Sequence, residues 1–282
     1  MTRRIIINAD DFGLCTGINK AIQQAHKQGV LTSATIMTNM PAAEEALNMA
    51  KKMPKLGIGV HLNLSRGKPL SKEPDVKMLV NADGQFASSL LRLSLLSVIK
   101  HRFRNAIRTE LACQIQWLID KGITPTHLDS HKNFHAFPPI FPIVCELARR
   151  FKINAIRYSY EPKQLCQLPW PLPTEGGKKR ANRARALALI NRLQNAELLK
   201  TNAMLGIAHM GRIDVNFFKA VTLYNQVEPA EIATHPGFPE EIEPEITSML
   251  HERKGDLDAL CCERTKQYFQ QADIELIHFG QL

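Results

Sequence analysis

The chain of 282 residues lacks any long apolar run, since no stretch approaches the roughly 18 uninterrupted apolar residues of a membrane-spanning helix. It also lacks a secretory signal pattern, because residues 1–4 are followed by only three isoleucines before the polar Asn8. No internal repeat and no low-complexity linker divides the sequence. We therefore expect a single domain spanning residues 1–282, in the cytoplasm.

Cysteine patterns typical of metal sites are absent as well. None of the six cysteines belongs to a CxxC pair, and two of them are adjacent on a predicted helix. The six are Cys15, Cys113, Cys145, Cys166, Cys261 and Cys262. In a cytoplasmic chain this arrangement favours reduced, mostly buried thiols over disulfides or a thiolate metal site.

The chain has a net charge of +9, but aromatic residues, which nucleic-acid-binding proteins use for stacking, make up only 6% of it. Cations cluster in residues 100–108 and 178–185, and Phe103 is the single aromatic residue within these two segments. Proteins that bind single-stranded nucleic acid combine cations with several stacking aromatics, so we expect no nucleic-acid partner. The positive charge fits either an anionic membrane surface or a basic face in water.

Runs with the apolar pattern of strands alternate with runs that have the period of helices. The strand-like runs cover residues 4–9, 33–38, 57–64, 126–129, 155–159, 206–209, 231–234 and 274–279. The helix-like runs cover residues 16–28, 41–53, 105–120, 139–151, 180–199, 214–224 and 256–271. Roughly eight strands separated by helices predict an α/β protein with an irregular, TIM-like (β/α) barrel. An open doubly wound sheet is the alternative.

One segment, residues 87–104, interrupts this alternation. It is rich in leucine and continues directly into Lys100, Arg102 and Arg104. An apolar helix followed by cations suits a helix that lies on a membrane surface, or a lid over an apolar substrate. The alternative is an inserted helix that packs on the barrel and has a solvated basic end.

Acids and histidines stand at the ends of four strand-like runs. Asp10 and Asp11 follow the first run, His61 lies near the end of another, and His235 follows a third. The fourth run ends in a denser group, namely His127, Asp129, His131 and His135. Because active sites of parallel α/β barrels lie at the carboxyl ends of the strands, this placement predicts a functional site there. If the segment is helical, His131 and His135 share one face, as metal-binding pairs at i and i+4 do.

One aspartate and two histidines would offer three protein ligands and leave positions for water, which is the pattern of a catalytic metal site. A divalent ion there would polarise a carbonyl group and lower the pKa of water. Ligand softness favours Zn²⁺ over Mg²⁺, but the sequence leaves both open. The alternatives are a helix cap or turn at the two aspartates and a histidine-containing loop without metal.

Three residues are candidates for supporting chemistry. Of the adjacent aspartates, one can ligate a metal while the other acts as a base. His235 can serve as a general acid to the leaving group, or it is a turn histidine. Arg157, inside a short strand-like run, can orient Asp10, or it forms a surface ion pair.

At these residues the sequence resembles the YdjC-like family of carbohydrate deacetylases, which includes the chitooligosaccharide deacetylases. The similar segments are residues 8–13, 29–35, 60–63, 127–131 and 235–236, and they span most of the chain. The resemblance implies an irregular (β/α) barrel, one divalent metal ion and the removal of acetyl groups from N-acetylglucosamine (GlcNAc) units. It implies metal ligands at Asp11, His61 and His131, a base at Asp10 and an acid at His235. It also suggests a substrate pocket that includes His127, Asp129 and His135.

The run between His131 and His135 departs from many chitooligosaccharide deacetylases, which carry consecutive histidines there. This run, the basic apolar insert and residues 160–162 are more similar to the hopanoid-biosynthesis-associated branch, for which a GlcNAc joined to a lipid is the expected substrate. The substrate is therefore either a soluble oligosaccharide or a lipid-linked glycoside met at a membrane surface. A homodimer is also among the expected assemblies.

Two other functions are compatible with the sequence. A phosphoesterase on the same scaffold should carry more carboxylates for a second metal ion, and none is evident. A catalytically silent sugar-binding protein would bind metal without releasing acetate.

Overall fold

Seven parallel strands form the centre of the structure, a computed structural model that describes residues 3–86, 89–165, 172–224 and 228–282. The strands are β1 (Arg3–Phe12), β2 (Ser33–Ile36), β3 (Gly57–Leu62), β4 (Leu128–Ser130), β5 (Ala203–Leu205), β6 (Ala230–Thr234) and β7 (Ile274–Ile277). Their order is β4-β3-β2-β1-β6-β5, and β7 pairs with the first residues of β1. Every pairing between these strands is parallel, which confirms the predicted α/β class.

Residues 155–160 occupy the place where a further strand would close the barrel. Ile156 makes an isolated parallel bridge to Leu128, and the Met204 N–H donates to the carbonyl oxygen of Tyr160 at 2.8 Å. These bonds join the β4 edge to the β5 edge without a regular strand between them. The seven strands thus form a half-barrel whose open side is bridged by residues 155–160, which agrees with the predicted irregular (β/α) barrel.

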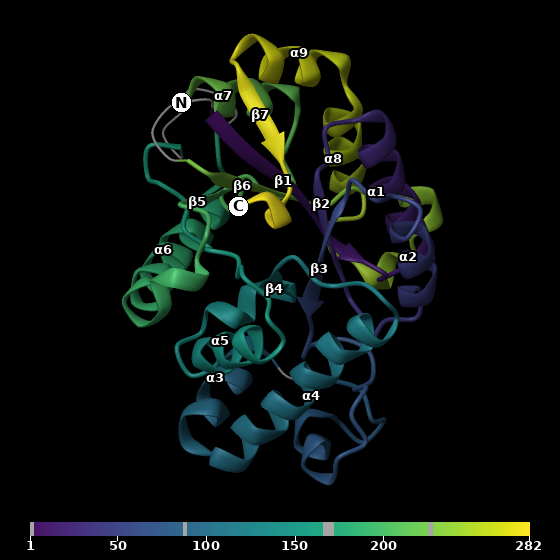
Figure 1. The fold of residues 1–282 in the computed structure, drawn as a ribbon, viewed down its shortest axis with the longest axis vertical. Helices are drawn as coiled ribbons and strands as arrows, with labels where there is room; N and C mark the ends of the chain where they lie inside the picture. Colours follow the sequence, from purple (N-terminus) through teal and green to yellow (C-terminus); the bar gives the residue numbers. More distant parts are fainter. Residues whose placement is uncertain (1–2, 87–88, 166–171, 225–227) are drawn as a thin grey trace.

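Helices surround this sheet (Figure 1). They are α1 (Thr16–Gln28), α2 (Ala43–Ala50), α3 (Leu90–Ile99), α4 (His101–Asp120), α5 (Phe141–Arg150), α6 (Glu175–Asn195), α7 (Val215–Leu223), α8 (Glu252–Cys261) and α9 (Glu263–Gln271). Helix α1 has the predicted bounds because Ile18, Ile22 and Ala25 form one buried stripe, which ends before Gly29. The strand β1 is buried along most of its length, as expected for a strand covered on both faces.

Several element boundaries differ from the prediction. Strand β5 ends before the predicted run at 206–209, because Gly206 has a φ of 102° and turns the chain out of the sheet. The predicted helix at 256–271 is two helices, since Cys262 has an extended conformation between α8 and α9. The insert forms α3, and its basic end begins α4 after an extended Lys100.

The predictions for the cysteines and for the insert at residues 87–104 can be compared with the structure only in part. Cys166 and residues 87–88 lie outside the described residues, and the other five cysteines have free thiols. Within the described residues, no helix combines the length and the apolar character that crossing a membrane requires.

Candidate active site

Asp10 and Asp11 both reach one cavity because the chain bends at the end of β1. Neighbouring residues of a regular strand point to opposite faces. Here Asp11 has a φ of 67°, and the register between β1 and β2 is interrupted between Ala9 and Phe12. Such left-handed backbone at a non-glycine residue is costly and concentrates at functional sites. The cavity, of about 150 Å³, is lined by both aspartates.

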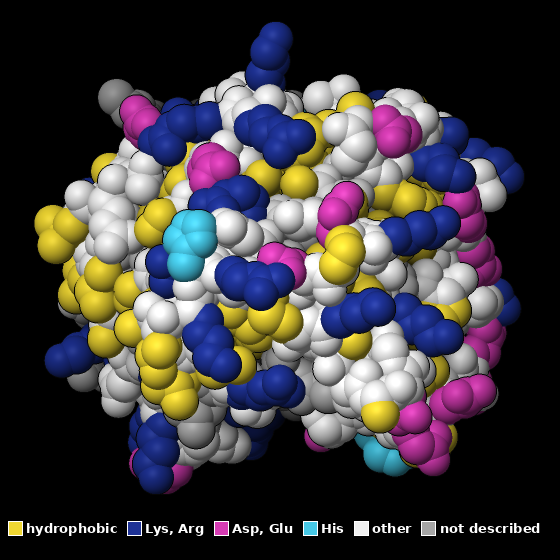
Figure 2. All heavy atoms as spheres, turned by 90° about the horizontal axis from the view of Figure 1, so that it is seen from below, with side chains coloured by type: hydrophobic (Ala, Val, Ile, Leu, Met, Phe, Trp, Pro, Cys, Tyr) yellow, Lys and Arg dark blue, Asp and Glu magenta, His cyan; other side chains and the backbone are white. Residues whose placement is uncertain are grey.

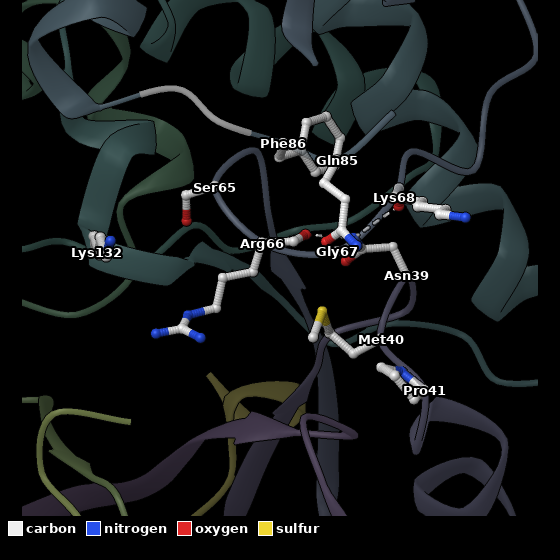
Figure 3. Close-up of a pocket in the computed structure, with 10 residues that line it drawn as sticks. All are labelled: Asn39, Met40, Pro41, Ser65, Arg66, Gly67, Lys68, Gln85, Phe86 and Lys132. Carbon is white, nitrogen blue, oxygen red and sulfur yellow. Dashed lines mark hydrogen bonds between the residues drawn. The ribbon is translucent and has the colours of Figure 1, made fainter. Parts of the chain in front are cut away.

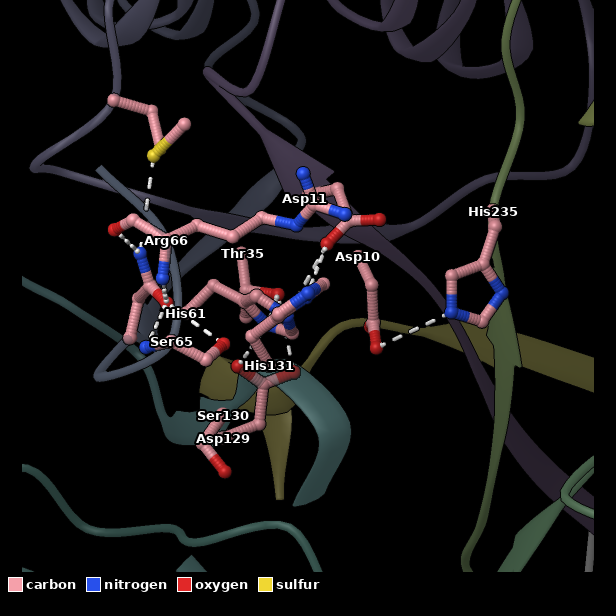
Figure 4. A network of polar contacts seen from close by, with 12 residues as sticks. Asp10, Asp11, Thr35, His61, Ser65, Arg66, Asp129, Ser130, His131 and His235 are labelled. Carbon is pink, nitrogen blue, oxygen red and sulfur yellow. Dashed lines mark hydrogen bonds and ion pairs between the residues drawn. The ribbon is translucent and has the colours of Figure 1, made fainter. Parts of the chain in front are cut away.

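Asp11, His61 and His131 form a buried cluster that fits a divalent metal ion (Figure 4). Asp11 Oδ1 lies 3.0 Å from His131 Nδ1 and 3.5 Å from His61 Nε2. Each residue offers one ligand atom, and the three atoms lie within 4.8 Å of one another. In addition, His131 Nε2 is buried and has no hydrogen-bond partner among the described residues. A carboxylate with two imidazoles is a donor set suited to Zn²⁺ and similar ions.

His61 is oriented from behind by Asp129. The Nδ1 atom of His61 donates to Asp129 Oδ1 at 2.7 Å, while Thr35 donates to the other carboxylate oxygen at 3.0 Å. Burial disfavours the imidazolium, but Asp129, Asp10 and Asp11 outweigh it and raise the pKa of His61 to about 9. A carboxylate behind a ligating histidine is the usual way to fix its ring and raise its basicity.

Arg157 holds Asp10 through two hydrogen bonds. Its Nη1 and Nη2 atoms donate to Asp10 Oδ2 and Oδ1 at 2.8 and 2.6 Å. Burial raises the pKa of Asp10, yet Arg157 outweighs this effect and keeps it below the usual range. The same guanidinium contacts Asp129 and Glu231 at 2.9 and 2.6 Å. In a second possible metal group, Asp10 with His61 and Asp129, both carboxylates are therefore already ion-paired with Arg157.

His235 follows β6 and faces Asp10 across the cavity (Figure 4). Its Nε2 atom lies 3.8 Å from Asp10 Oδ2. Burial lowers the pKa of His235 to about 4, so the ring is neutral near pH 7. A neutral ring beside a carboxylate can take up a proton and pass it on.

The three residues predicted to contact substrate, His127, Asp129 and His135, do not line this cavity. His127 is fully buried and stacks on Phe279 with ring centroids 3.7 Å apart. Asp129 is fully buried behind His61, to which it is hydrogen-bonded. The structure therefore places His127, Asp129 and His135 behind the cavity wall, where they support the site and do not contact substrate.

His135 turns away because the segment after His131 is not a regular helix. Lys132 and Asn133 have φ values of 59° and 54°, which break the helical period. His135 consequently contacts the hydroxyl of Ser130 at 2.7 Å and the carbonyl oxygen of Arg157 at 3.3 Å. The predicted shared face of His131 and His135 is thus wrong.

The sequence reasoning did not find Arg253, Asp256, Arg66 or Lys132. Arg253 Nη2 donates to Asp11 Oδ2 at 2.5 Å, and Asp256 accepts the His235 N–H at 2.8 Å. Arg66 and Lys132 line the same cavity as Asp11, His61 and His131, and we call it the metal cavity after this candidate cluster. Charged residues of this kind on helices and loops have no local pattern that separates them from solvated surface charges.

Two pockets adjoin the metal cavity, and we call them the polar arm and the apolar arm. The polar arm, of about 630 Å³, shares Arg66 and Lys132 with the metal cavity (Figure 3). It is lined by Asn39, Met40, Pro41, Ser65, Arg66, Gly67, Lys68, Gln85, Phe86 and Lys132. The apolar arm, of about 210 Å³, shares Lys132, Asn133 and Met210 with the metal cavity. Its remaining lining is Ala136, Phe137, Ser159, Arg180, Arg183, Ala184, Leu187 and Ile207.

The family model described as YdjC-like protein matches residues 4–271. The chain belongs to the YdjC-like family. It is 32% identical over 280 residues to a carbohydrate deacetylase of Brevibacillus brevis, with 99% of each chain covered. It is 41% identical over 149 residues to a chitooligosaccharide deacetylase of Salmonella typhimurium, which covers 52% of this chain and 56% of that relative.

A solved structure from Enterococcus faecalis V583 shares the fold of this family member along its full length. Its title describes a putative cellobiose-phosphate cleavage protein. It has a TM-score of 0.77 and 23% sequence identity, and the match covers 100% of this chain and 99% of that one. At this identity the likeness establishes the fold, and the family resemblance inferred from the strand-end motifs is confirmed by the family model.

Asp11→Asn and His131→Ala should each abolish stoichiometric zinc binding, because each removes one of three protein ligands. Zinc content after dialysis, measured by elemental analysis, checks this. His251→Ala, which removes an exposed imidazole at the start of α8, is the matched control and should bind zinc like the unmodified protein. Full zinc content in either ligand variant would exclude this cluster as the metal site.

Proposed function

We propose that this protein is a metal-dependent carbohydrate deacetylase that hydrolyses the N-acetyl group of GlcNAc units. The observation that carries the proposal is the buried Asp11, His61 and His131 cluster beside Asp10 and His235. Two relatives matched over almost the whole chain, from Brevibacillus brevis and Clostridium beijerinckii, are named carbohydrate deacetylase. The metal, when bound, would act as a Lewis acid on the acetamide carbonyl and lower the pKa of water.

Asp10 and His235 are placed to move the protons of this reaction. Asp10 is the proposed base for the attacking water, and Arg157 fixes its orientation through both carboxylate oxygens. Because the same arginine lowers the pKa of Asp10, a proton that Asp10 accepts from water is readily passed on. His235, at 3.8 Å from Asp10 Oδ2, is the proposed acceptor of that proton and its donor to the departing amine. Catalytic hydrogen bonds that are long in a free enzyme commonly shorten when substrate is bound.

The same contacts argue against a two-metal phosphoesterase. A second ion would need carboxylates that are free of other cations. Among the described residues, the second candidate group contains Asp10 and Asp129, and both are bonded to Arg157. A silent sugar-binding protein would not need the buried proton-transfer pair of Asp10 and His235.

Asp10→Asn should retain zinc and lower kcat by roughly 100- to 10,000-fold, since general base catalysis contributes about that much. The amide introduced by this change keeps the size of the side chain but cannot accept the proton. Acetate release from N,N′-diacetylchitobiose and zinc content, measured on the same sample, check both parts. A fully active variant would rule out the proposed base.

For the substrate, we propose a GlcNAc glycoside with an apolar, lipid-type aglycone of the hopanoid kind in preference to a soluble chitooligosaccharide. The polar arm offers amide, hydroxyl and cationic groups to a sugar. The apolar arm, which Lys132 also lines, offers Phe137, Leu187, Ile207 and Met210. One glycoside could therefore place its sugar and its apolar part in different arms.

This substrate proposal predicts that KM falls as the aglycone of a GlcNAc glycoside is lengthened from methyl to octyl, because each buried methylene contributes up to about 0.8 kcal/mol. Leu187→Asn should raise KM for the octyl glycoside and leave the methyl glycoside unchanged. Leu189→Asn, on the exposed side of α6 with 54% exposure, is the matched control. Equal kcat/KM values along the series, with higher values for chitooligosaccharides, would favour the soluble substrate.

We also propose that α3 meets a membrane surface. Its second half exposes Leu95, Val98 and Ile99 by 55%, 61% and 66%. Figure 2 views the molecule from the side of α3 and α4, and hydrophobic side chains lie there among many lysines and arginines. Apolar side chains surrounded by cations suit an anionic lipid surface. A second copy of the chain, in a homodimer, is the other occupant that this face could take.

Co-sedimentation should show binding to phosphatidylglycerol vesicles that weakens with salt and with the change Ile99→Asp. Leu223→Asp, which alters a residue of α7 that is 72% exposed, should bind vesicles normally. Absence of vesicle binding would contradict the membrane proposal. A dimer in sedimentation velocity that Ile99→Asp dissociates would assign the face to self-association instead.

A further inference from the structure

Helix α8 contacts both sides of the candidate site through two neighbouring turns. Arg253 and Asp256 are three residues apart, so their side chains leave the same face of the helix. Each residue is only 2% exposed. Arg253 reaches the end of β1, and Asp256 reaches the residue after β6. Neither residue takes part in the proton transfers proposed above.

Arg253 binds one carboxylate oxygen of Asp11 and leaves the other oxygen beside the two histidines of the cluster. Its Nη2 atom donates to Asp11 Oδ2 at 2.5 Å, while Asp11 Oδ1 remains beside His131 and His61. The aliphatic part of Arg253 passes close to Gly237, where an added Cβ would lie only 3.0 Å from Arg253 Cδ. A carboxylate with one oxygen held in this way is presented to a cation through the other oxygen.

Asp256 fixes the backbone that carries His235. Its Oδ2 atom accepts the N–H of His235 at 2.8 Å, and two residues later the Gly237 N–H donates to the carbonyl oxygen of Arg253 at 3.2 Å. The loop after β6 is thus bonded twice to α8. Because these groups are buried, the loop cannot shift without leaving polar atoms unsatisfied.

We infer that Arg253 and Asp256 are positioning residues, which together set the spacing between the metal ligand Asp11 and the proton-transfer residue His235. This inference rests on the proposed function for the role of His235. It gives two independent predictions. Loss of the Arg253 side chain should weaken metal binding, whereas loss of the Asp256 side chain should slow turnover without weakening metal binding.

Zinc affinity of the metal-free protein, measured by competition with a chromophoric chelator, tests Arg253. Arg253→Met should weaken zinc binding by about 10- to 100-fold, the usual effect of losing a partner of a metal ligand. Arg253→Lys should recover part of the loss because it restores the charge. Lys254→Met removes an exposed cation of the same helix and should bind zinc normally. Unchanged affinity in Arg253→Met, or an equal loss in Lys254→Met, overturns this role.

Turnover at saturating zinc tests Asp256. Asp256→Ala should keep zinc affinity and lower kcat by roughly 100-fold, as expected when a reacting group is displaced. Asp256→Asn, which keeps an acceptor oxygen, should restore most of kcat, and Asp258→Ala on the exposed face is the control. A parallel loss of zinc affinity and kcat in Asp256→Ala, or a full kcat, overturns the role.

If the unmodified protein binds zinc but releases no acetate from any N-acetyl sugar, the proposed function fails, while the chelator measurement still decides the role of Arg253.

Discussion

A single buried guanidinium connects the strands that carry this site. Arg157 contacts Asp10 in β1, Asp129 in β4 and Glu231 in β6. The three carboxylates would repel one another in the absence of this cation, and burial together with the neighbouring acids already raises the pKa of Glu231 to about 7. Breaking a buried ion pair costs about 3–5 kcal/mol because one charge is left without a partner. The relative positions of these three strands therefore depend on Arg157.

Two adjacent aspartates acquire different environments from this arrangement. Asp10 is bonded on both oxygens to Arg157, while Asp11, turned by its left-handed backbone, faces His61 and His131. His61 links the two environments, since its Nδ1 atom donates to Asp129, which Arg157 also contacts. The proposed metal ligand and the proposed base can thus be neighbours in sequence without competing for the same cation.

Most of the elements and the location of the site could be predicted from the sequence, because alternating periodicity and polar residues at strand ends are local signals. The resemblance to the YdjC-like family then singled out Asp11, His61 and His131 as a group, and these three residues lie together in the structure. The direction of a side chain that depends on local backbone angles could not be predicted. The left-handed residues after His131 turn His135 away from the cavity. Arg253 was missed because its partner Asp11 is distant in sequence and a charged helical residue ordinarily faces solvent.

If the Asp11 cluster holds the metal on which the proposed deacetylation depends, activity must follow metal occupancy. The most direct measurement is acetate release from N-acetylglucosamine glycosides by the protein stripped of metal and then titrated with Zn²⁺. We expect no release from the stripped protein and full activity when one equivalent of metal is bound. Acetate release that is equally fast without metal, or metal binding that never yields acetate from any of these glycosides, would contradict it.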